Sequence, residues 1–154
     1  MNTGDGFKRF RSHEWRQGGK VSLWRYAARN RNYDGWHLTA DAQARASLMA
    51  LIDAMLVDGP GATRSIGITT PTKAMLDVPN CPIRKVIVPG NLRLSIVTDP
   101  NEWVFPEASE QARLSVGVDW LPLLHDGLRD IGQGLGDYSI GRTDRGSLPL
   151  WFWW

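Results

Sequence analysis

The chain has 154 residues, of which 42% are hydrophobic, and its formal net charge is +2. This length and apolar content suit one domain with a core large enough to fold without disulfides or metals. A single cysteine, Cys81, excludes an internal disulfide. No apolar run approaches the roughly 20 residues that span a bilayer, and the N-terminus lacks the apolar core of a signal peptide. We therefore expect a cytoplasmic protein that is not embedded in a membrane.

Basic side chains are concentrated near the N-terminus. Residues 1–34 carry eight basic and three acidic side chains, a net charge of +5, whereas the remaining residues carry ten basic and thirteen acidic ones, a net charge of −3. Such a division is typical of a surface that meets an anionic partner. Residues 1–6 are polar and are expected to be disordered, which leaves 7–154 as a single domain.

The first elements in chain order are predicted strands. Residues 7–16 alternate aromatic and basic side chains, Gly18 and Gly19 supply a turn, and residues 20–28 alternate again. This arrangement predicts a β-hairpin. A short strand at 36–39 is expected to follow, so that three antiparallel strands open the domain.

The two main helices have recognisable start and stop signals. Asp41 is a suitable N-cap for a helix that ends at Gly59, and Asp119 is expected to cap a second helix that runs to about Gln133, with Pro122 in its first turn. Because each helix carries an apolar stripe, both are expected to pack on a sheet. The apolar side chains of the first helix recur at spacings of three and four: Leu48, Leu51, Ile52, Met55 and Leu56.

Further strands are expected at residues 63–69, 84–88, 92–98 and 112–118. The turn Pro89-Gly90-Asn91 predicts that the second and third of these form a hairpin, and Thr70-Pro71 predicts a short helix to about Asp77. The predicted fold class is α+β, with a mostly antiparallel β-sheet and two main amphipathic helices packed on it.

Residues 48–55 and 121–128 share apolar and acidic positions in register. One interpretation is two related halves, each a strand followed by a helix. The other is a purely local likeness, since strand, cap and helix units share the same signals.

The C-terminal segment is rich in large apolar side chains, with three of the eight tryptophans in its last four positions. With a period of two, residues 148–154 present apolar side chains on both faces, as expected of a strand buried on both sides. The other interpretation leaves one face, with Trp151 and Trp153, for a partner or ligand. Asp137 and Tyr138, which precede this segment, are candidate binding residues beside it.

Motifs that carry catalysis or bind cofactors are incomplete. His13-Glu14 begins like a zincin motif, but Gln17 stands where the second histidine would coordinate zinc. Gly132, Gly134 and Gly136 follow a helix instead of preceding one, so they are expected to stop that helix and not to bind phosphate. No metal, no cofactor and no catalytic residue is therefore assigned.

The segment Gly136-Asp-Tyr-Ser-Ile-Gly141, together with Leu150-Trp-Phe-Trp-Trp154 and Gly35-Trp-His-Leu-Thr-Ala-Asp41, resembles a family of small bacterial proteins of unknown function. The likeness covers most of the chain. It implies a bacterial cytosolic protein with no assigned activity, and it carries over no catalytic residue.

The leading functional hypothesis is a non-catalytic protein that binds another protein, for example as a neutralising partner of the immunity type. Its motivation is the absence of catalytic motifs together with abundant tryptophan, a residue favoured at binding hot spots. A different hypothesis is an enzyme with a site near Asp137 and Tyr138, where a carboxylate and a phenol are adjacent.

The second hypothesis is single-stranded nucleic-acid binding by the basic, aromatic N-terminal hairpin. Phosphates need cationic side chains and exposed bases need stacking rings, and Arg9, Arg11, Trp15 and Arg16 supply both. The alternative interpretation of the same residues is an ordinary half-buried sheet, with aromatic side chains on one face and arginines on the other.

Overall fold

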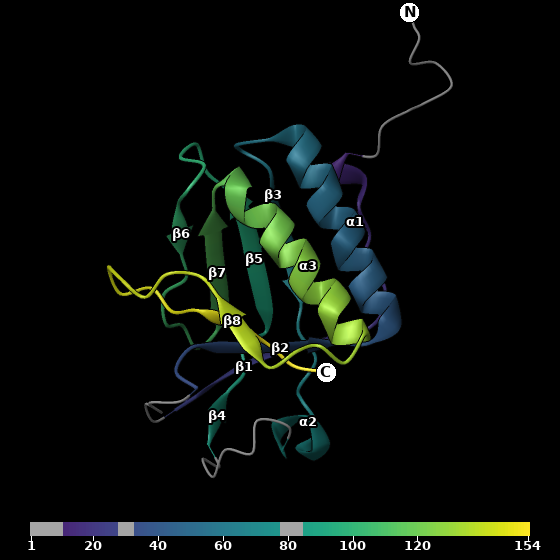
Figure 1. Ribbon diagram of the computed structural model, residues 1–154, viewed down its shortest axis with the longest axis vertical. Helices are drawn as coiled ribbons and strands as arrows, with labels where there is room; N and C mark the ends of the chain where they lie inside the picture. Colours follow the sequence, from purple (N-terminus) through teal and green to yellow (C-terminus); the bar gives the residue numbers. More distant parts are fainter. Residues whose placement is uncertain (1–10, 28–32, 78–84) are drawn as a thin grey trace, which may run out of the picture.

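The computed structural model describes residues 11–27, 33–77 and 85–154 (Figure 1). Its helices are the 3-10 turns η2 (Ser12–Glu14) and η3 (Val118–Trp120) and the α-helices α1 (Ala42–Asp58), α2 (Lys73–Asp77) and α3 (Leu121–Gly132). Its strands are β1 (Val21–Tyr26), β2 (Trp36–Ala40), β3 (Thr63–Gly67), β4 (Val86–Ile87), β5 (Asn91–Ile96), β6 (Trp103–Val104), β7 (Gln111–Val116), β8 (Tyr138–Ile140) and β9 (Leu150–Phe152). The predicted α+β class is confirmed, with two sheets in place of one.

The C-terminal segment forms an interior strand of the first sheet, whose order is β4-β1-β2-β9-β8. β9 runs parallel to β2 and antiparallel to β8. Leu150 and Phe152 face the main core, whereas Trp151 faces the opposite side of the sheet and packs against a second aromatic cluster. The prediction of a strand with two apolar faces is therefore confirmed.

The second sheet has the order β3-β5-β7-β6, with β5 and β7 parallel and the outer pairs antiparallel. Figure 1 shows β5 and β7 running across the direction of β1 and β2, with α1 and α3 lying side by side on the near side of β5 and β7. The inner faces of both sheets and the facing sides of the two helices enclose one main hydrophobic core.

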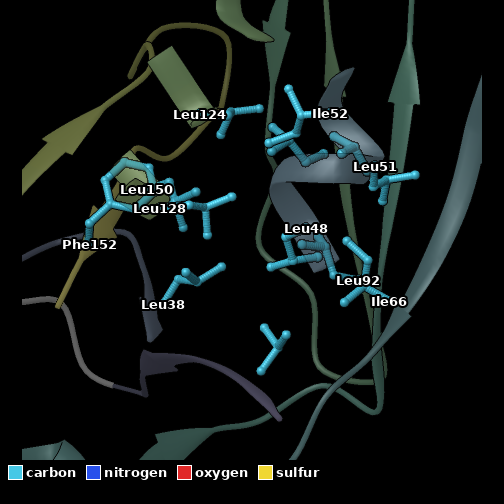
Figure 2. Close-up of a pocket in the computed structure, with 13 residues that line it drawn as sticks. Leu38, Leu48, Leu51, Ile52, Ile66, Leu92, Leu124, Leu128, Leu150 and Phe152 are labelled. Atoms are coloured by element: carbon cyan, nitrogen blue, oxygen red, sulfur yellow. The ribbon is translucent and has the colours of Figure 1, made fainter. Parts of the chain in front are cut away.

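This core contains a small cavity of about 40 Å³ whose lining is entirely apolar. Figure 2 shows Leu48 and Leu51 of α1 and Leu124 and Leu128 of α3 pointing toward it, opposite Leu38 and other side chains of the sheets. Ligand sites generally have volumes of several hundred Å³. The cavity is therefore a packing void of the core and not a site for a metabolite.

The predicted caps of α1 are confirmed. The Asp41 carboxylate accepts a hydrogen bond of 2.8 Å from the backbone N–H of Ala44. At the other end, Gly59 adopts a φ of +75° and its N–H donates to the carbonyl of Met55. The predicted apolar stripe is too wide by one residue, because Leu56 is 45% exposed and points away from the core.

The predicted N-terminal hairpin is wrong over residues 11–16. These residues form η2 and an extended segment that packs on α1, where the Trp15 indole N–H donates to the carbonyl of Ser47 at 2.7 Å. Residues 7–10 lie outside the described residues. β1 pairs with β2 and β4, so the domain does not open with three consecutive antiparallel strands. Trp15, which the alternating pattern assigned to a strand, is instead buried against α1, a helix that follows later in the chain.

The predicted hairpin around Pro89-Gly90-Asn91 is also wrong. β4 pairs with β1 in the first sheet, whereas β5 pairs with β3 and β7 in the second, so this turn carries the chain from one sheet to the other. The two-residue strand β6 was not predicted, because two residues show no alternation. Asp119 lies within η3, and the N-cap of α3 is Trp120, which makes no side-chain cap bond.

The two helix segments with similar sequences do occupy similar environments. Each follows a strand, β2 before α1 and β7 before α3, and the helices pack against each other. Three of the aligned apolar positions are buried in both: Leu48 with Leu121, Leu51 with Leu124, and Met55 with Leu128. None of the helices in the described parts of the chain is long and apolar enough to cross a membrane.

Gly127 allows α3 to approach β9 closely. A Cβ atom at this position would lie 2.3 Å from the Phe152 ring, so Gly127→Ala is expected to lower the free energy of unfolding by about 1–3 kcal/mol, although alanine favours helix. Gly132→Ala on the same helix is the control, because its Cβ would meet only the movable side chain of Arg45. Urea unfolding monitored by tryptophan fluorescence measures both, and equal losses would contradict this account.

Candidate functional site

The predicted residues Trp151 and Trp153 belong to an aromatic cluster on the outer side of the five-stranded sheet. Its centre is His37 of β2, which is fully buried. The register places His37 between Trp24 of β1 and Trp151 of β9. Its ring stacks at centroid distances of 5.7 Å from Trp24, 6.2 Å from Trp151 and 5.9 Å from Trp153.

Both nitrogens of the His37 ring have hydrogen-bond partners. An indole N–H can only donate, so the 2.8 Å contact between Trp153 Nε1 and His37 Nδ1 requires Nδ1 to be unprotonated. The proton of the neutral ring therefore lies on Nε2, which donates to the carbonyl of Tyr33 at 2.8 Å. The geometry selects one neutral tautomer of His37.

The electrostatics agree with that tautomer. Burial lowers the pKa of His37 from 6.5 to about 4, because the protonated ring would lose its hydration, and the hydrogen bond to the Tyr33 carbonyl opposes this only in part. A second proton on Nδ1 would also break the bond from Trp153. His37 thus acts as a neutral bridge between strands, and its nitrogens are not presented to a substrate.

The cluster leaves little tryptophan surface for a partner. Trp24 is fully buried and Trp153 is 2% exposed, whereas Trp151 is partly exposed and donates its indole N–H to the carbonyl of Asp34. Met75 and Leu76 of α2 cover part of the cluster. Within the described residues, the buried Trp24 Nε1 has no hydrogen-bond acceptor. Most of the predicted tryptophan surface is therefore a second core.

Asp137 and Tyr138 are not brought together with those tryptophans. Tyr138 pairs with Phe152 across β8 and β9 and faces the main core, on the side opposite Trp151. Its hydroxyl donates to Asp130 Oδ2 of α3 at 2.8 Å. Asp137 is exposed, has a φ of +78°, and its backbone N–H donates to the carbonyl of Phe152.

The predicted nucleic-acid residues are also used within the fold. Arg11 forms an ion pair with Asp58. The pKa of the Asp58 carboxyl is lowered most by the hydrogen bond from the Ser12 side chain and further by Arg11. Trp15 is 3% exposed, so its ring is not available for stacking on a base in this conformation. Arg16 is exposed. Arg9 lies outside the described residues.

A polar cleft of about 640 Å³ lies between the turn at Asp34, residues 106–107 and the β8–β9 loop. Asp34 and Glu107 line it, together with Ser147. The Ser147 hydroxyl accepts from the N–H of Phe105 and donates to the carbonyl of Trp103, so it is bound within the fold and is not a free nucleophile. No group of three histidine, cysteine or acidic residues that could hold a metal occurs in the described ranges.

A more open feature lies between α1 and α3, and we call it the helix groove. Its volume is about 220 Å³. An apolar floor from Leu56 and Leu121 adjoins the acidic side chains of Asp53 and Asp126. The complete lining is Ile52, Asp53, Leu56, Leu121, Pro122, His125 and Asp126.

The sequence interpretation did not single out this groove. Its apolar residues share helical spacing with the core, so periodicity assigned Leu56 to the buried stripe.

The free energy of unfolding is expected to fall by about 3 kcal/mol as the pH decreases from 6.5 to 4. In this range His37 binds a proton in the unfolded state but stays largely unprotonated in the folded state. The folded pKa is the lower one, so this stability is present above 6.5 and is lost toward 4. His37→Phe should be less stable at neutral pH and lack this dependence. Urea unfolding across this pH range measures it. His125→Gln is the control that keeps the dependence, and an unchanged slope in His37→Phe would contradict the assignment.

Burial, together with the hydrogen bond and the charge of Asp130, raises the pKa of Tyr138 to about 12. Because the folded pKa is the higher one, the associated stability is present below the ordinary value of 10 and is lost as the pH rises toward 12. Ultraviolet titration should reveal one phenol that ionises near pH 12 and disappears in Tyr138→Phe. In Asp130→Asn the same phenol should ionise at lower pH. If Tyr138→Phe still showed the same high-pH ionisation as the wild-type protein, the assignment would be refuted.

Comparison of the chain with protein-family models, with curated proteins and with solved structures finds no match. The resemblance of the segments 136–141 and 150–154 to a family of small bacterial proteins stays a prediction. Function is therefore inferred from the geometry alone.

Proposed function

We propose that the protein is a non-catalytic binding protein and that the helix groove receives a segment of another protein. The observation that carries the proposal is an open groove with an apolar floor on the helix pair, where Leu56 is 45% exposed. Contiguous exposed apolar surface rimmed by polar residues is typical of protein-interaction sites.

The charges at the groove indicate the chemistry of the partner. The Asp53 side chain is 71% exposed, and its Oδ1 lies 3.8 Å from Nε2 of His125. Asp126 is partly neutralised by Arg129 at 3.3 Å. A partner that inserts an apolar side chain and places lysine or arginine beside Asp53 would complement this surface. A neutralising partner of the immunity type is one form that such a protein takes.

The enzyme alternative has less support. Of the two residues that the sequence offered for it, Asp137 and Tyr138, the Tyr138 hydroxyl is held in a hydrogen bond to Asp130. The buried His37 ring, which the enzyme hypothesis did not include, is bound on both nitrogens. Neither Asp137 nor Tyr138 lines the polar cleft or the helix groove. A general acid or base needs an accessible proton and a place for the substrate beside it.

Site-specific photocrosslinking in cells that express the protein naturally tests the proposal. A photoreactive residue at Leu56 or His125 should yield the same crosslinked polypeptide, because both positions line one groove. Position Leu135, which is 58% exposed and does not line the groove, is the matched control.

A charge-reversal variant adds a quantitative measurement. The partner identified by crosslinking should bind the Asp53→Lys variant about tenfold more weakly than the wild-type protein, because a repulsive charge pair replaces an attractive one. Adducts at Leu135 as abundant as at Leu56, or no adduct at either groove position, would reject the proposal.

A further inference from the structure

Two strands of the four-stranded sheet repeat the same short sequence. β5 reads Asn91-Leu-Arg-Leu-Ser-Ile96 and β7 reads Gln111-Ala-Arg-Leu-Ser-Val116. The strands are parallel neighbours, and the repeats pair in exact alignment, Arg93 with Arg113 and Ser95 with Ser115. Identical residues therefore lie side by side on the sheet.

The alternation of a strand puts the two kinds of residue on opposite faces. Leu94 and Leu114 are buried in the main core, whereas Arg93 and Arg113 are exposed on the outer face. The two main helices lie on the inner side of this sheet (Figure 1). We call the outer surface the donor face, and its members are Thr63, Ser65, Gly67, Asn91, Arg93, Ser95, Val104, Gln111, Arg113 and Ser115.

The donor face holds two adjacent positive charges with no compensation on it. Neighbouring strands are about 4.8 Å apart, and like charges at directly paired positions destabilise a sheet. None of the donor-face residues is acidic, and neither arginine forms an ion pair with any described residue. Arg93 is directed across β3 by a hydrogen bond of 3.3 Å from Nη1 to Ser65 Oγ. The face therefore keeps a local repulsion that an anion would relieve.

We propose that Arg93 and Arg113 together bind a phosphoryl group on the donor face. A guanidinium presents a planar fork of N–H donors, and one fork suffices for the two oxygens of a carboxylate. The terminal oxygens of a phosphoryl group, two in a diester and three or more in a monoester or in inorganic phosphate, are arranged tetrahedrally and not in one plane, so the group can accept from two forks at once. The hydroxyls of Ser65, Ser95 and Ser115 supply further donors of the kind that contact phosphates.

The composition of the donor face also limits how the ligand is held. None of its residues is aromatic, so it offers no ring on which a base would stack. Recognition is therefore of the phosphoryl group and not of a nucleobase. This site lies on the side of the sheet away from the helix groove, so it does not depend on the proposed protein partner.

Titration with inorganic phosphate at constant ionic strength, followed by ¹⁵N NMR of the backbone amides and arginine side chains, tests the inference. Wild-type protein should show saturable shifts confined to β5, β7 and the side chains of Arg93 and Arg113. Arg93→Gln and Arg113→Gln should each weaken binding by about tenfold, as expected for one charge-assisted hydrogen-bonding group, and the double variant should abolish it. Arg129→Gln on α3 makes the same charge change elsewhere and should leave binding unchanged.

Two further ligands distinguish the chemistry and its source. Acetate at the same ionic strength should give at least about tenfold weaker binding, because one fork satisfies it. A short single-stranded oligonucleotide that binds more tightly than phosphate, at the same residues and with steep salt dependence, would identify the source as a nucleic-acid backbone; binding no tighter than phosphate would identify a small phosphorylated compound.

Either result with the oligonucleotide supports the phosphoryl site. The inference is overturned if phosphate causes no localised shifts, if acetate binds equally well, or if the double variant responds like the wild-type protein. None of these outcomes bears on crosslinking at the helix groove, so the two proposals fail separately.

Discussion

The parallel pairing of β9 with β2 is the contact on which the rest of the structure depends. It places Phe152 in the main core and Trp151 in the aromatic cluster. The backbone N–H of Trp153 donates to Leu38, and its indole N–H donates to His37. A slip of one residue would exchange the two faces of the strand, so a single register maintains both cores. The close approach of α3 to the sheet uses the same register, because Phe152 packs where α3 has a glycine.

The side chains that most often carry chemistry are occupied by this architecture. His37 connects strands, Tyr138 connects β8 to α3 through Asp130, and Ser147 connects the β8–β9 loop to the segment around Phe105. The helix groove and the donor face are both open, on opposite sides of the four-stranded sheet. The first combines apolar and acidic residues, and the second presents arginine and hydroxyl groups. Occupancy of one would not obstruct the other.

Much of the secondary structure could be predicted, and the candidate sites mostly could not. The caps of α1 and the two apolar faces of β9 follow from residues within a few positions of each other. The helix groove was missed because Leu56 has the spacing of a core residue, and the donor face was missed although the Arg-Leu-Ser repeat is visible in the sequence. A repeated motif becomes informative only when its copies are neighbours, and sequence alone does not say that β5 and β7 pair.

The sequence by itself determined where α1 begins and ends, where most of the longer strands lie, and that the C-terminal strand has two apolar faces. Caps, glycines and the period of side chains are local properties, so a short stretch of chain is sufficient to specify them. Only the tertiary structure decided that β4 joins β1, that Trp15 is buried by α1, and that Tyr138 and Trp151 face opposite sides of one sheet. These outcomes depend on contacts between distant segments, whose energies no local pattern contains.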